Sequence, residues 1–427
     1  MVEAKYQPAL DIFDEMMHGK LKTHLNSCVH CGLCGESCHY YLTHREDKYI
    51  PGKKVDLISA IYRRYYTLLG KTVPKWVGAK DLNNETVAEM VDLIYGACTM
   101  CGRCSMHCSI GVDIAFLVRA GRSMLVEIDK VVPGLQSTVN AALNTGNNMG
   151  IPKDELVDTI EWIAEDLQME MDDEKATIPL DKKGAKMLYT LNPREPKFFP
   201  LSISAAAKIF YAADEDWTLS ADAYDVTNYC YFSGDDKGGA VITQRLVDKM
   251  AELGCETLAL AECGHGFRAN RWEGSNYINK AYPFKVISIV ELIADYIRTG
   301  KIKLDPTKNT KRLTVHDPCN MVREGGVIEE QRFILKQAVS DFVEMTPNRE
   351  NNFCCGGGGG QLAMSEFADR RIKAGQIKAD QIKKTEAKVV ATPCHNCIDQ
   401  LMELNKEYKM GIEMKSIAEI VADAIIL

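Results

Sequence analysis

The sequence predicts two kinds of structure in one chain: a mostly helical N-terminal domain that carries regular cysteine runs, and a duplicated α/β domain after it. The fold class is therefore α+β / α/β. Two cysteine runs fall in the first third of the 427 residues. In the second half, short apolar strands alternate with helical segments, as in parallel α/β sheets, and one residue pattern occurs twice. A chain of this length suits two or three domains.

Four regions are expected along the chain. They are 1–135 for the domain with the regular cysteine runs, 136–184 for a helical connector, 185–308 for a first α/β unit and 309–427 for a second. The connector contains an acidic amphipathic helix over Asp154 to Met169, because its apolar residues recur at helical spacing.

A repeat defines the two α/β units. The segment Ser288 to Asp295 recurs as Ser416 to Asp423, 128 residues later. In each unit a helical stretch leads to an apolar strand and then to a cysteine, and open α/β sheets place their sites at such strand ends. The predicted strands are Lys186 to Leu191, Thr257 to Ala261, Arg312 to Val315 and Lys388 to Ala391, and the predicted helices are Arg245 to Gly254 and Arg370 to Lys384.

Composition and charge exclude several classes of protein. The net charge of −8, with both signs interspersed, gives no basic footprint for nucleic acid. The best candidate for a membrane span, Val286 to Ile297, is interrupted by Glu291 and Asp295 and is interpreted as an amphipathic helix. Met1 to Ser27 shows no Sec-type export signal. We therefore expect a cytoplasmic protein whose cysteines are reduced and metal-bound, without a disulfide framework.

One segment, Tyr62 to Tyr66, combines aromatic and basic residues within the helical stretch expected between Pro51 and Gly70. We interpret it as the solvent-exposed face of a helix, with a docking patch as the alternative.

Two complete C-x2-C-x2-C-x3-C runs predict two cubane [4Fe–4S] clusters. Three cysteines at i, i+3 and i+6 wrap around one face of a cubane, and the fourth reaches the other cluster. Zinc sites pair two C-x2-C arms and need no further cysteines, so zinc and buried structural cysteines are weaker interpretations. Gly32, Gly35 and Gly102 leave room for backbone amides near the sulfides. The crossing rule assigns Cys28, Cys31, Cys34 and Cys108 to one cluster, and Cys98, Cys101, Cys104 and Cys38 to the other.

A different cysteine set follows in the last α/β unit. It comprises Cys319, the vicinal pair Cys354 and Cys355, and the C-x2-C pair Cys394 and Cys397. Five cysteines exceed the needs of a four-cysteine cubane, whereas a vicinal pair and a C-x2-C can share an asymmetric cluster. The run Gly356 to Gly360 permits positive φ angles and close backbone approach. The alternative is a dithiol/disulfide redox centre without metal.

These motifs resemble the heterodisulfide reductase subunits HdrC and HdrB fused in one chain, as in HdrD and its relatives DsrK, HmcF and TmcB of sulfate-metabolising organisms. The resemblance covers most of the chain, including Gly146 to Gly150 in the connector. It implies a ferredoxin-like, HdrC-like domain and a duplicated CCG (HdrB-like) domain. In that family the CCG motif binds a noncubane [4Fe–4S] cluster where disulfide chemistry occurs. The implied catalytic ligands are Cys319, Cys354, Cys355, Cys394 and Cys397.

The first α/β unit departs from the family pattern. Asn192 stands at a strand end where the pattern has a cysteine, Tyr229 and Cys230 replace the vicinal pair, and Cys263 lacks the second cysteine of a C-x2-C. These departures favour a single noncubane cluster, as in the DsrK-like branch. Cys230, Cys255 and Cys263 are expected to be small buried hydrophobes.

Three histidines, His265, His316 and His395, stand beside the cysteine motifs. We expect structural histidines with satisfied hydrogen bonds, and proton donation or support of neighbouring ligands is the alternative.

The resemblance implies an oxidoreductase acting on sulfur groups. Electrons would pass from an external donor through the cubane pair to the noncubane cluster and a disulfide, in a direction set by the potentials of the partners. The implied partners are a cytochrome b-type membrane subunit, other subunits of a transmembrane redox complex, and a DsrC-like protein that carries the thiol. The chain would attach peripherally to the inner face of the cell membrane.

Two other functions compete with this one. The chain could serve only electron transfer within a transmembrane redox complex, or it could be the iron–sulfur subunit of a flavin-dependent 2-hydroxyacid or glycerol-3-phosphate dehydrogenase. No G-x-G-x-x-G fingerprint is present, so a flavin would lie on another chain.

Overall fold

The computed structural model describes residues 2–427, which group into two compact units. Unit 1 comprises the residues up to Ser137 together with Cys230–Asp236 and Phe353–Lys378. Unit 2 comprises Thr138–Tyr229, Lys237–Asn352 and Ala379–Leu427. The vicinal cysteine pair and its glycine run therefore belong to the same unit as the N-terminal cysteine runs. The four sequence regions given above stay the predicted domain division.

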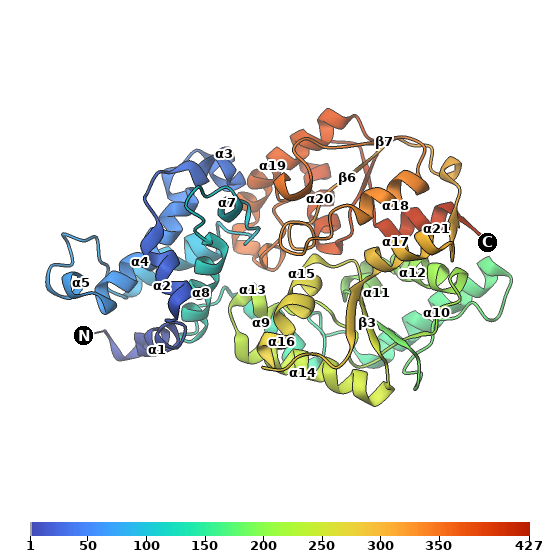
Figure 1. Cartoon of the computed structure of the whole chain (residues 1–427), viewed down its shortest axis with the longest axis horizontal. Helices are drawn as coiled ribbons and strands as arrows, with labels where there is room; N and C mark the ends of the chain where they lie inside the picture. The colour runs from blue at the N-terminus through green and yellow to red at the C-terminus, as the bar shows by residue number, and fades with distance from the viewer. Residues whose placement is uncertain (1) are drawn as a thin grey trace. The chain divides into compact units, whose positions relative to one another are not determined.

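Unit 1 is built from helices, as predicted. Its helix α4 (Pro51–Tyr66) begins with proline, whose fixed φ suits the first helical position. Val55, Ile58 and Ile61 recur on its buried face, and α4 packs against α8 (Ile114–Val126) (Figure 1). The other helices of unit 1 are α1 (Gln7–Glu15), α2 (Gly19–Ser27), α3 (His39–His44), α5 (Leu68–Thr72), α6 (Asn84–Met90), α7 (Arg103–Met106) and α13 (Cys230–Ser233).

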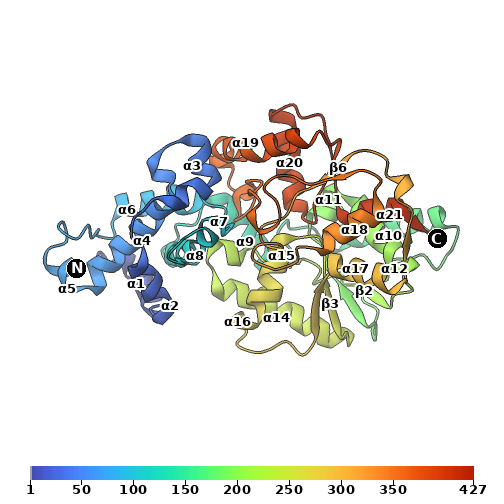
Figure 2. The ribbon, with the colours of Figure 1, turned by 45° about the horizontal axis from the view of Figure 1, so that its top comes forward.

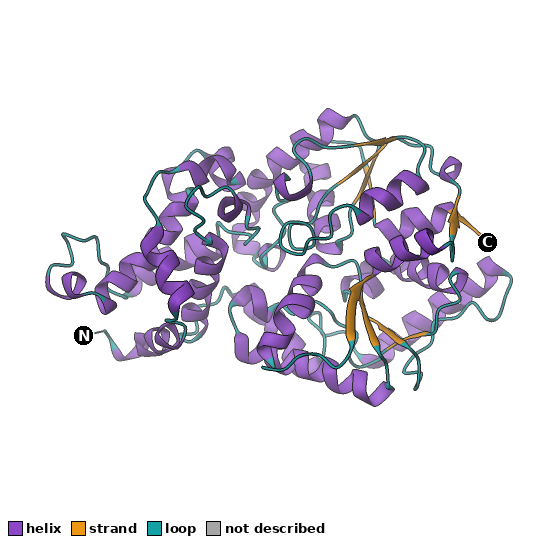
Figure 3. Cartoon of the chain, viewed as in Figure 1, coloured by secondary structure: helices purple, strands orange, loops and turns teal. Residues whose placement is uncertain are grey.

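Unit 2 contains two four-stranded parallel sheets of the same topology (Figure 3). The first has the order β2-β1-β3-β4 and the second β7-β6-β8-β9, which confirms the predicted duplicated α/β fold. A short antiparallel pair, β5 and β10, aligns Leu304 with Ile425. The strands are β1 (Met187–Tyr189), β2 (Trp217–Leu219), β3 (Thr257–Leu260), β4 (Lys285–Ser288), β5 (Lys303–Leu304), β6 (Leu313–Val315), β7 (Phe342–Val343), β8 (Val389–Ala391), β9 (Glu413–Lys415) and β10 (Ile425–Ile426).

Helices from the two halves of unit 2 pack against each other in two equivalent pairs. Helix α12 (Pro200–Ala212) of the first half packs on α21 (Ile417–Ala424) of the second, and α17 (Ile289–Thr299) packs on α18 (Glu330–Ala338) (Figure 2). Because α12 and α18 each follow the first strand of their half, and α17 and α21 the last, the two contacts are equivalent. The remaining helices are α10 (Lys153–Met171), α11 (Arg194–Phe198), α14 (Asp236–Leu253), α15 (Gly264–Phe267), α16 (Gly274–Tyr277) and α20 (His395–Glu407), while α9 (Pro133–Thr145) and α19 (Ala368–Thr385) contain residues of both units.

The interpretation of Val286 to Ile297 as one amphipathic helix is wrong in its first residues. Val286 lies in strand β4, and α17 begins at Ile289. The reason is a capping box: the Ser288 hydroxyl accepts the Glu291 N–H at 3.2 Å, and the Glu291 carboxylate accepts the Ser288 N–H at 2.9 Å. Among the described residues, no helix has both the length and the apolar character needed to cross a membrane.

Candidate metal centres

The two N-terminal cysteine runs have the same backbone conformation. In the first run, His30 and Gly32 have φ of 57° and 76°; in the second, Met100 and Gly102 have φ of 53° and 72°. Glycine adopts positive φ readily, whereas His30 and Met100 must be held there by the surrounding turn. In the second run this turn brings the Met100 N–H to the Cys98 sulfur at 3.4 Å.

The first cavity joins the first run to the last cysteine of the second. Cys28, Cys31 and Cys108 line it together. Burial raises the pKa of Cys34, and the nearby thiols of Cys28, Cys38 and Cys108 add to the effect. The Gly52 N–H donates to the Cys34 sulfur at 3.3 Å. Three of the four cysteines that the crossing rule assigns to one cubane therefore line this cavity, and the fourth, Cys34, is bonded to Gly52 of its lining.

The second cavity gathers the complementary set around a buried lysine. Its thiols are those of Cys38, Cys98, Cys101 and Cys104. Lys54 of α4 also lines it, is only 2% exposed, and donates to the carbonyl of Ala97. Burial by itself would lower the pKa of Lys54, but the four nearby thiols raise it above the ordinary value. A positive charge is thus held beside the second group of cysteines.

The second cavity is also lined by buried polar groups that have no hydrogen-bond partner, as expected around an iron–sulfur cluster. Within the described part of the chain, the buried atoms His39 Nε2, Tyr40 OH and Thr99 Oγ1 have no hydrogen-bond partner, and all three residues line the cavity. Buried polar atoms are normally bonded, so their absence of partners calls for an acceptor. Four thiols are the ligand set that a [4Fe–4S] cubane requires, and a cation and free donors around them would tune its reduction potential.

The glycine run that follows the vicinal cysteines is bound directly to the second cysteine run. Arg122 of α8, fully buried, donates to the carbonyls of Cys98 and Gly359, each at 2.8 Å. Gln361 also donates to the Cys98 carbonyl, at 3.4 Å. Gly359 has a φ of 64°, and a Cβ there would lie 2.6 Å from the backbone of Thr99. Only glycine therefore permits this close approach.

The vicinal pair is also tied to the second run by side chains. The guanidinium of Arg103 lies 3.8 Å from the ring centre of Phe353, the residue before Cys354. Burial raises the pKa of Tyr40 well above its usual range, and the thiols of Cys98 and Cys354 raise it further. Tyr40 is thus near a cysteine of each motif.

The predicted positive φ angles in the glycine run are confirmed at three positions, Gly356, Gly359 and Gly360, with φ of 106°, 64° and 85°. The turn directs N–H groups at both vicinal sulfurs. The Gly356 N–H lies 3.4 Å from the Cys354 sulfur, and the Gly357 N–H lies 3.5 Å from the Cys355 sulfur. Such amide donors favour the thiolate form that binds metal.

In unit 2 the C-x2-C pair occupies the start of α20. Cys394 is its N-cap residue, and its sulfur accepts the Gly264 N–H at 3.3 Å. A hydrogen bond from the Cys397 side chain lowers the pKa of Cys394, and N–H groups of Gly264, Cys397 and Asn396 act in the same direction against the effect of burial. The Cys394 thiolate, the metal-binding form, is therefore favoured.

Cys319 follows β6 in a segment fixed by a buried ion pair. Asp317 and Arg332, each 1% exposed, form two parallel hydrogen bonds of 2.8 Å. The same carboxylate accepts from Gln331 and from the Arg349 N–H, both at 2.7 Å. These contacts hold the pKa of Asp317 below its ordinary value against the effect of burial. The Asp317 backbone, two residues before Cys319, is thereby fixed.

Each of the five cysteines of the second set is buried. Cys354 and Cys355 belong to unit 1, whereas Cys319, Cys394 and Cys397 belong to unit 2.

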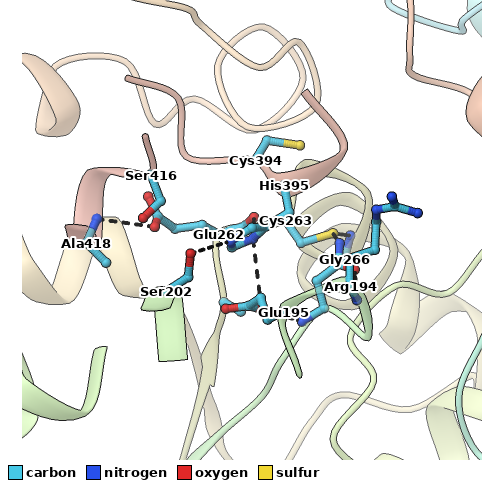
Figure 4. Close-up of polar contacts among 12 residues, drawn as sticks. Arg194, Glu195, Ser202, Glu262, Cys263, Gly266, Cys394, His395, Ser416 and Ala418 are labelled. Carbon is cyan, nitrogen blue, oxygen red and sulfur yellow. Dashed lines mark hydrogen bonds and ion pairs between the residues drawn. The ribbon is translucent and has the colours of Figure 1, made fainter. Parts of the chain in front are cut away.

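A buried polar cluster in unit 2 surrounds His395 and has no signal in the sequence motifs (Figure 4). Its Nε2 is 3.0 Å from the Ser202 hydroxyl, and its Nδ1 is 3.1 Å from the Glu262 carbonyl. The Glu262 carboxylate accepts the N–H groups of Ile417 and Ala418 at the start of α21. Burial raises the pKa of Glu262 to about 8 and lowers that of His395 to about 4. His395 is thus the structural histidine that was predicted.

The interpretation of Cys263 as a small hydrophobe is incomplete. The residue is fully buried, but its sulfur accepts the Gly266 N–H at 3.3 Å and the Asn192 amide at 3.4 Å. Asn192, which replaces a cysteine of the family pattern, thus supplies a hydrogen bond to the remaining one. Cys230 and Cys255 are buried, as predicted. The contact with Asn192 joins residues 71 positions apart and therefore has no local signal in the sequence.

Comparison with known proteins supports the cysteine motifs. Residues 24–112 match the 4Fe-4S dicluster domain and residues 313–402 match the cysteine-rich (CCG) domain. The chain is 27% identical to the Hdr-like menaquinol oxidoreductase iron-sulfur subunit 2 of Archaeoglobus fulgidus, over 98% of this chain and 83% of that protein. It is 27% identical to a subunit of the dihydromethanophenazine:CoB--CoM heterodisulfide reductase of Methanosarcina barkeri, over 94% of both. It is 23% identical to the EtfAB:quinone oxidoreductase of Syntrophomonas wolfei, over 89% of this chain and 55% of that protein.

Proposed function

We propose that this chain carries electrons between a membrane donor and a disulfide. Its domains are those of a heterodisulfide-reductase-like iron–sulfur subunit, as its resemblance to HdrD predicts. In this proposal two cubane [4Fe–4S] clusters are bound by the two N-terminal cysteine runs in the crossed arrangement. A noncubane [4Fe–4S] cluster is bound by the second cysteine set. The ligands of that cluster are Cys319, Cys354, Cys355, Cys394 and Cys397.

The observation that carries the proposal is the contact between the second cysteine run and the glycine run. Arg122 bonds the carbonyls of Cys98 and Gly359, so the vicinal cysteines are held beside the second cavity. An iron–sulfur cluster, when bound, supplies one-electron transfer, which requires closely spaced groups along a route. This contact supports a route from the second cubane to the vicinal pair.

The two N-terminal cavities differ in a way that gives the route an order. Cys31 of the first cavity is exposed, whereas Cys38 of the second is buried. The buried charges of Lys54 and Arg122 lie beside the second cavity and favour added negative charge there. We therefore place electron entry at the first cubane, followed by the second cubane and then the vicinal pair.

For the substrate we propose a thiol or disulfide carried by a DsrC-like protein, in either direction of electron flow. The first half of unit 2 has no second set of five cysteines, so the chain has one such site and not the two of the family pattern. An extended arm that docks on the protein would supply the orientation that a small ligand gets from its own pocket. The proposed membrane partner is a cytochrome b-type subunit that passes quinone-derived electrons, on the cytoplasmic side.

A second candidate function is electron transfer between a flavoprotein and a quinone, without a disulfide substrate. The similarity to an EtfAB:quinone oxidoreductase favours it. The two N-terminal cavities would serve this function equally well. The two candidate functions therefore differ in the chemistry at the second cysteine set.

The test combines metal analysis with spectroscopy on anaerobically purified protein. We expect about twelve iron atoms per chain, and about eight in a Cys355→Ala variant. The matched control, Cys230→Ala, removes a buried cysteine outside the motifs and should keep about twelve. Treatment with a disulfide should produce a new EPR signal in the wild type and none in Cys355→Ala. About eight iron atoms in the wild type would remove the noncubane cluster, and a full complement without a disulfide-dependent signal would favour the second candidate.

A further inference from the structure

A group of large apolar side chains is exposed at one end of unit 1. These are Leu68 and Leu69 of α5 and Val73 and Trp76 of the turn after it, with exposures of 77%, 50%, 42% and 80%. We call these four residues the apolar tip. Figures 1 and 2 show that α5 and the following turn project beyond the end of α4. Groups of large exposed apolar residues usually mark a surface that contacts a protein or a membrane.

The apolar tip is held in shape by hydrogen bonds at its base. The hydroxyl of Thr67 accepts the N–H of Gly70 at 3.1 Å, and the hydroxyl of Tyr65 accepts the N–H of Leu82 at 3.0 Å. Gly70 is buried, and a Cβ there would lie 1.8 Å from the carbonyl oxygen of Arg63, so the turn closes only with glycine. Because the segment is ordered before it binds anything, little conformational entropy is lost on binding.

Positive charge predominates around the apolar tip. Residues 67–80 contain Lys71, Lys75 and Lys80 and no aspartate or glutamate, although the whole chain has a net charge of −8. Lys71 and Lys75 are exposed. Two acidic residues that follow, Asp81 and Glu89, are paired with Arg64 and Lys80, each at 2.6 Å. The side chains around Trp76 therefore present an excess of positive charge.

This combination favours a lipid surface over a protein partner. The buried centres of protein interfaces are depleted of lysine. Tryptophan with leucine and flanking lysine is instead typical of segments at the membrane interface, where the ring lies at headgroup level and each lysine near anionic lipid adds to the affinity.

We propose that the apolar tip inserts into the headgroup region of an anionic bilayer, with Lys71 and Lys75 against lipid phosphates. This contact deepens the membrane attachment of the proposed function, but it requires neither electron transfer nor a disulfide substrate. The tip would orient the helical unit toward the membrane subunit that supplies electrons.

Cosedimentation of the full cluster-loaded chain with vesicles tests the proposal. We expect binding to vesicles of phosphatidylcholine and phosphatidylglycerol (about 7:3) that is at least roughly tenfold stronger than binding to phosphatidylcholine alone. The triple variant Leu68→Ser, Leu69→Ser, Trp76→Ser should lose roughly tenfold or more of this binding. Lys71→Glu with Lys75→Glu should abolish the preference for anionic vesicles. The matched control, Trp162→Ser, removes a 58% exposed tryptophan from the acidic helix α10 and should bind as the wild type does.

Iron content and EPR spectra of every variant should equal those of the wild type, which separates the lipid contact from cluster loading. Equal vesicle binding by the triple variant and the wild type would overturn the proposal. The absence of vesicle binding by the wild type would also overturn the proposal. This holds if the triple variant instead fails to join an integral membrane protein, and equally if it changes the self-association of the chain in sedimentation velocity. If the redox function failed while vesicle binding followed the expected pattern, only the proposed function would be lost.

Discussion

The guanidinium of Arg122 donates a hydrogen bond of 2.8 Å to the carbonyl oxygen of Gly359, a residue 237 positions away in sequence. The same buried group bonds the carbonyls of Cys98 and Ile94. One side chain of α8 thus connects the second cysteine run with the glycine run beside the vicinal cysteines. The geometry of the proposed electron route depends on this connection.

Replacing Arg122 by methionine should therefore weaken both the fold of unit 1 and the vicinal cysteine site. We expect the free energy of unfolding to fall by about 3 kcal/mol or more, because several buried carbonyls lose their hydrogen-bond donor at once. The unfolding midpoint, followed by loss of cluster absorbance in denaturant, measures it. Arg119→Met on the same helix removes an ion pair to Asp236 and a cation–π contact with the ring of Tyr231, and should cost about 1–2 kcal/mol. Equal effects of the two substitutions would contradict the connecting role of Arg122.

The crossed arrangement predicts that Cys38→Ala damages the cluster otherwise held by the second run. Cys38 lines the cavity of Cys98 and Cys101, although it belongs to the first run in sequence. EPR of the reduced variant should show the signal of the first cubane intact and that of the second altered. Cys255→Ala, a buried cysteine outside the runs, should leave both signals unchanged. Damage confined to the first cubane would show that the assignment is wrong.

Lys54→Met should lower the reduction potential of the second cubane. The buried ammonium stabilises added negative charge, and its removal is expected to shift the potential by on the order of 60 mV for each 1.4 kcal/mol of lost interaction. Potentiometric titration followed by EPR measures the shift. Lys53→Met changes the neighbouring residue of α4, which is exposed and lines the first cavity, so solvent screening should keep its effect on the second cubane much smaller. A second cubane whose potential is equal in Lys54→Met and the wild type would refute the tuning role.

Glu262 should make the stability of unit 2 depend on pH. Its folded pKa is about 8, above the ordinary value of 4.5. Between these values the folded state binds more protons than the unfolded state, so stability falls as the pH rises, by up to about 1.4 kcal/mol per unit. Glu262→Gln stays neutral and should make this slope between pH 6 and 8 shallower in denaturant unfolding, while buried Glu195, whose pKa burial also raises, keeps its own contribution. Glu256→Gln, at an exposed position, should keep the wild-type slope. A slope equal to that of the wild type in Glu262→Gln would exclude a protonated carboxyl at this position.

Local patterns in the sequence determined much of this protein. The spacing of the cysteine runs predicts the turns in which His30 and Met100 take matching φ angles, because a short turn has few ways to direct three side chains to one side. The repeat predicts two sheets of the same topology, and the capping boxes at Ser288 and Ser416 occupy equivalent positions within it. Strand and helix types follow from short-range sterics and apolar spacing, which are readable along the chain.

Only the tertiary structure decided which distant segments share a unit. It groups Phe353–Lys378 with the N-terminal cysteine runs, places Lys54 among the thiols of the second cavity, and gives Glu262 its role at the start of α21. None of these relationships has a local signal, because each depends on the fit of buried surfaces and on hydrogen-bond donors that come from remote parts of the chain. Cysteine spacing identifies ligands, but the charges and hydrogen bonds around those ligands are set by long-range packing.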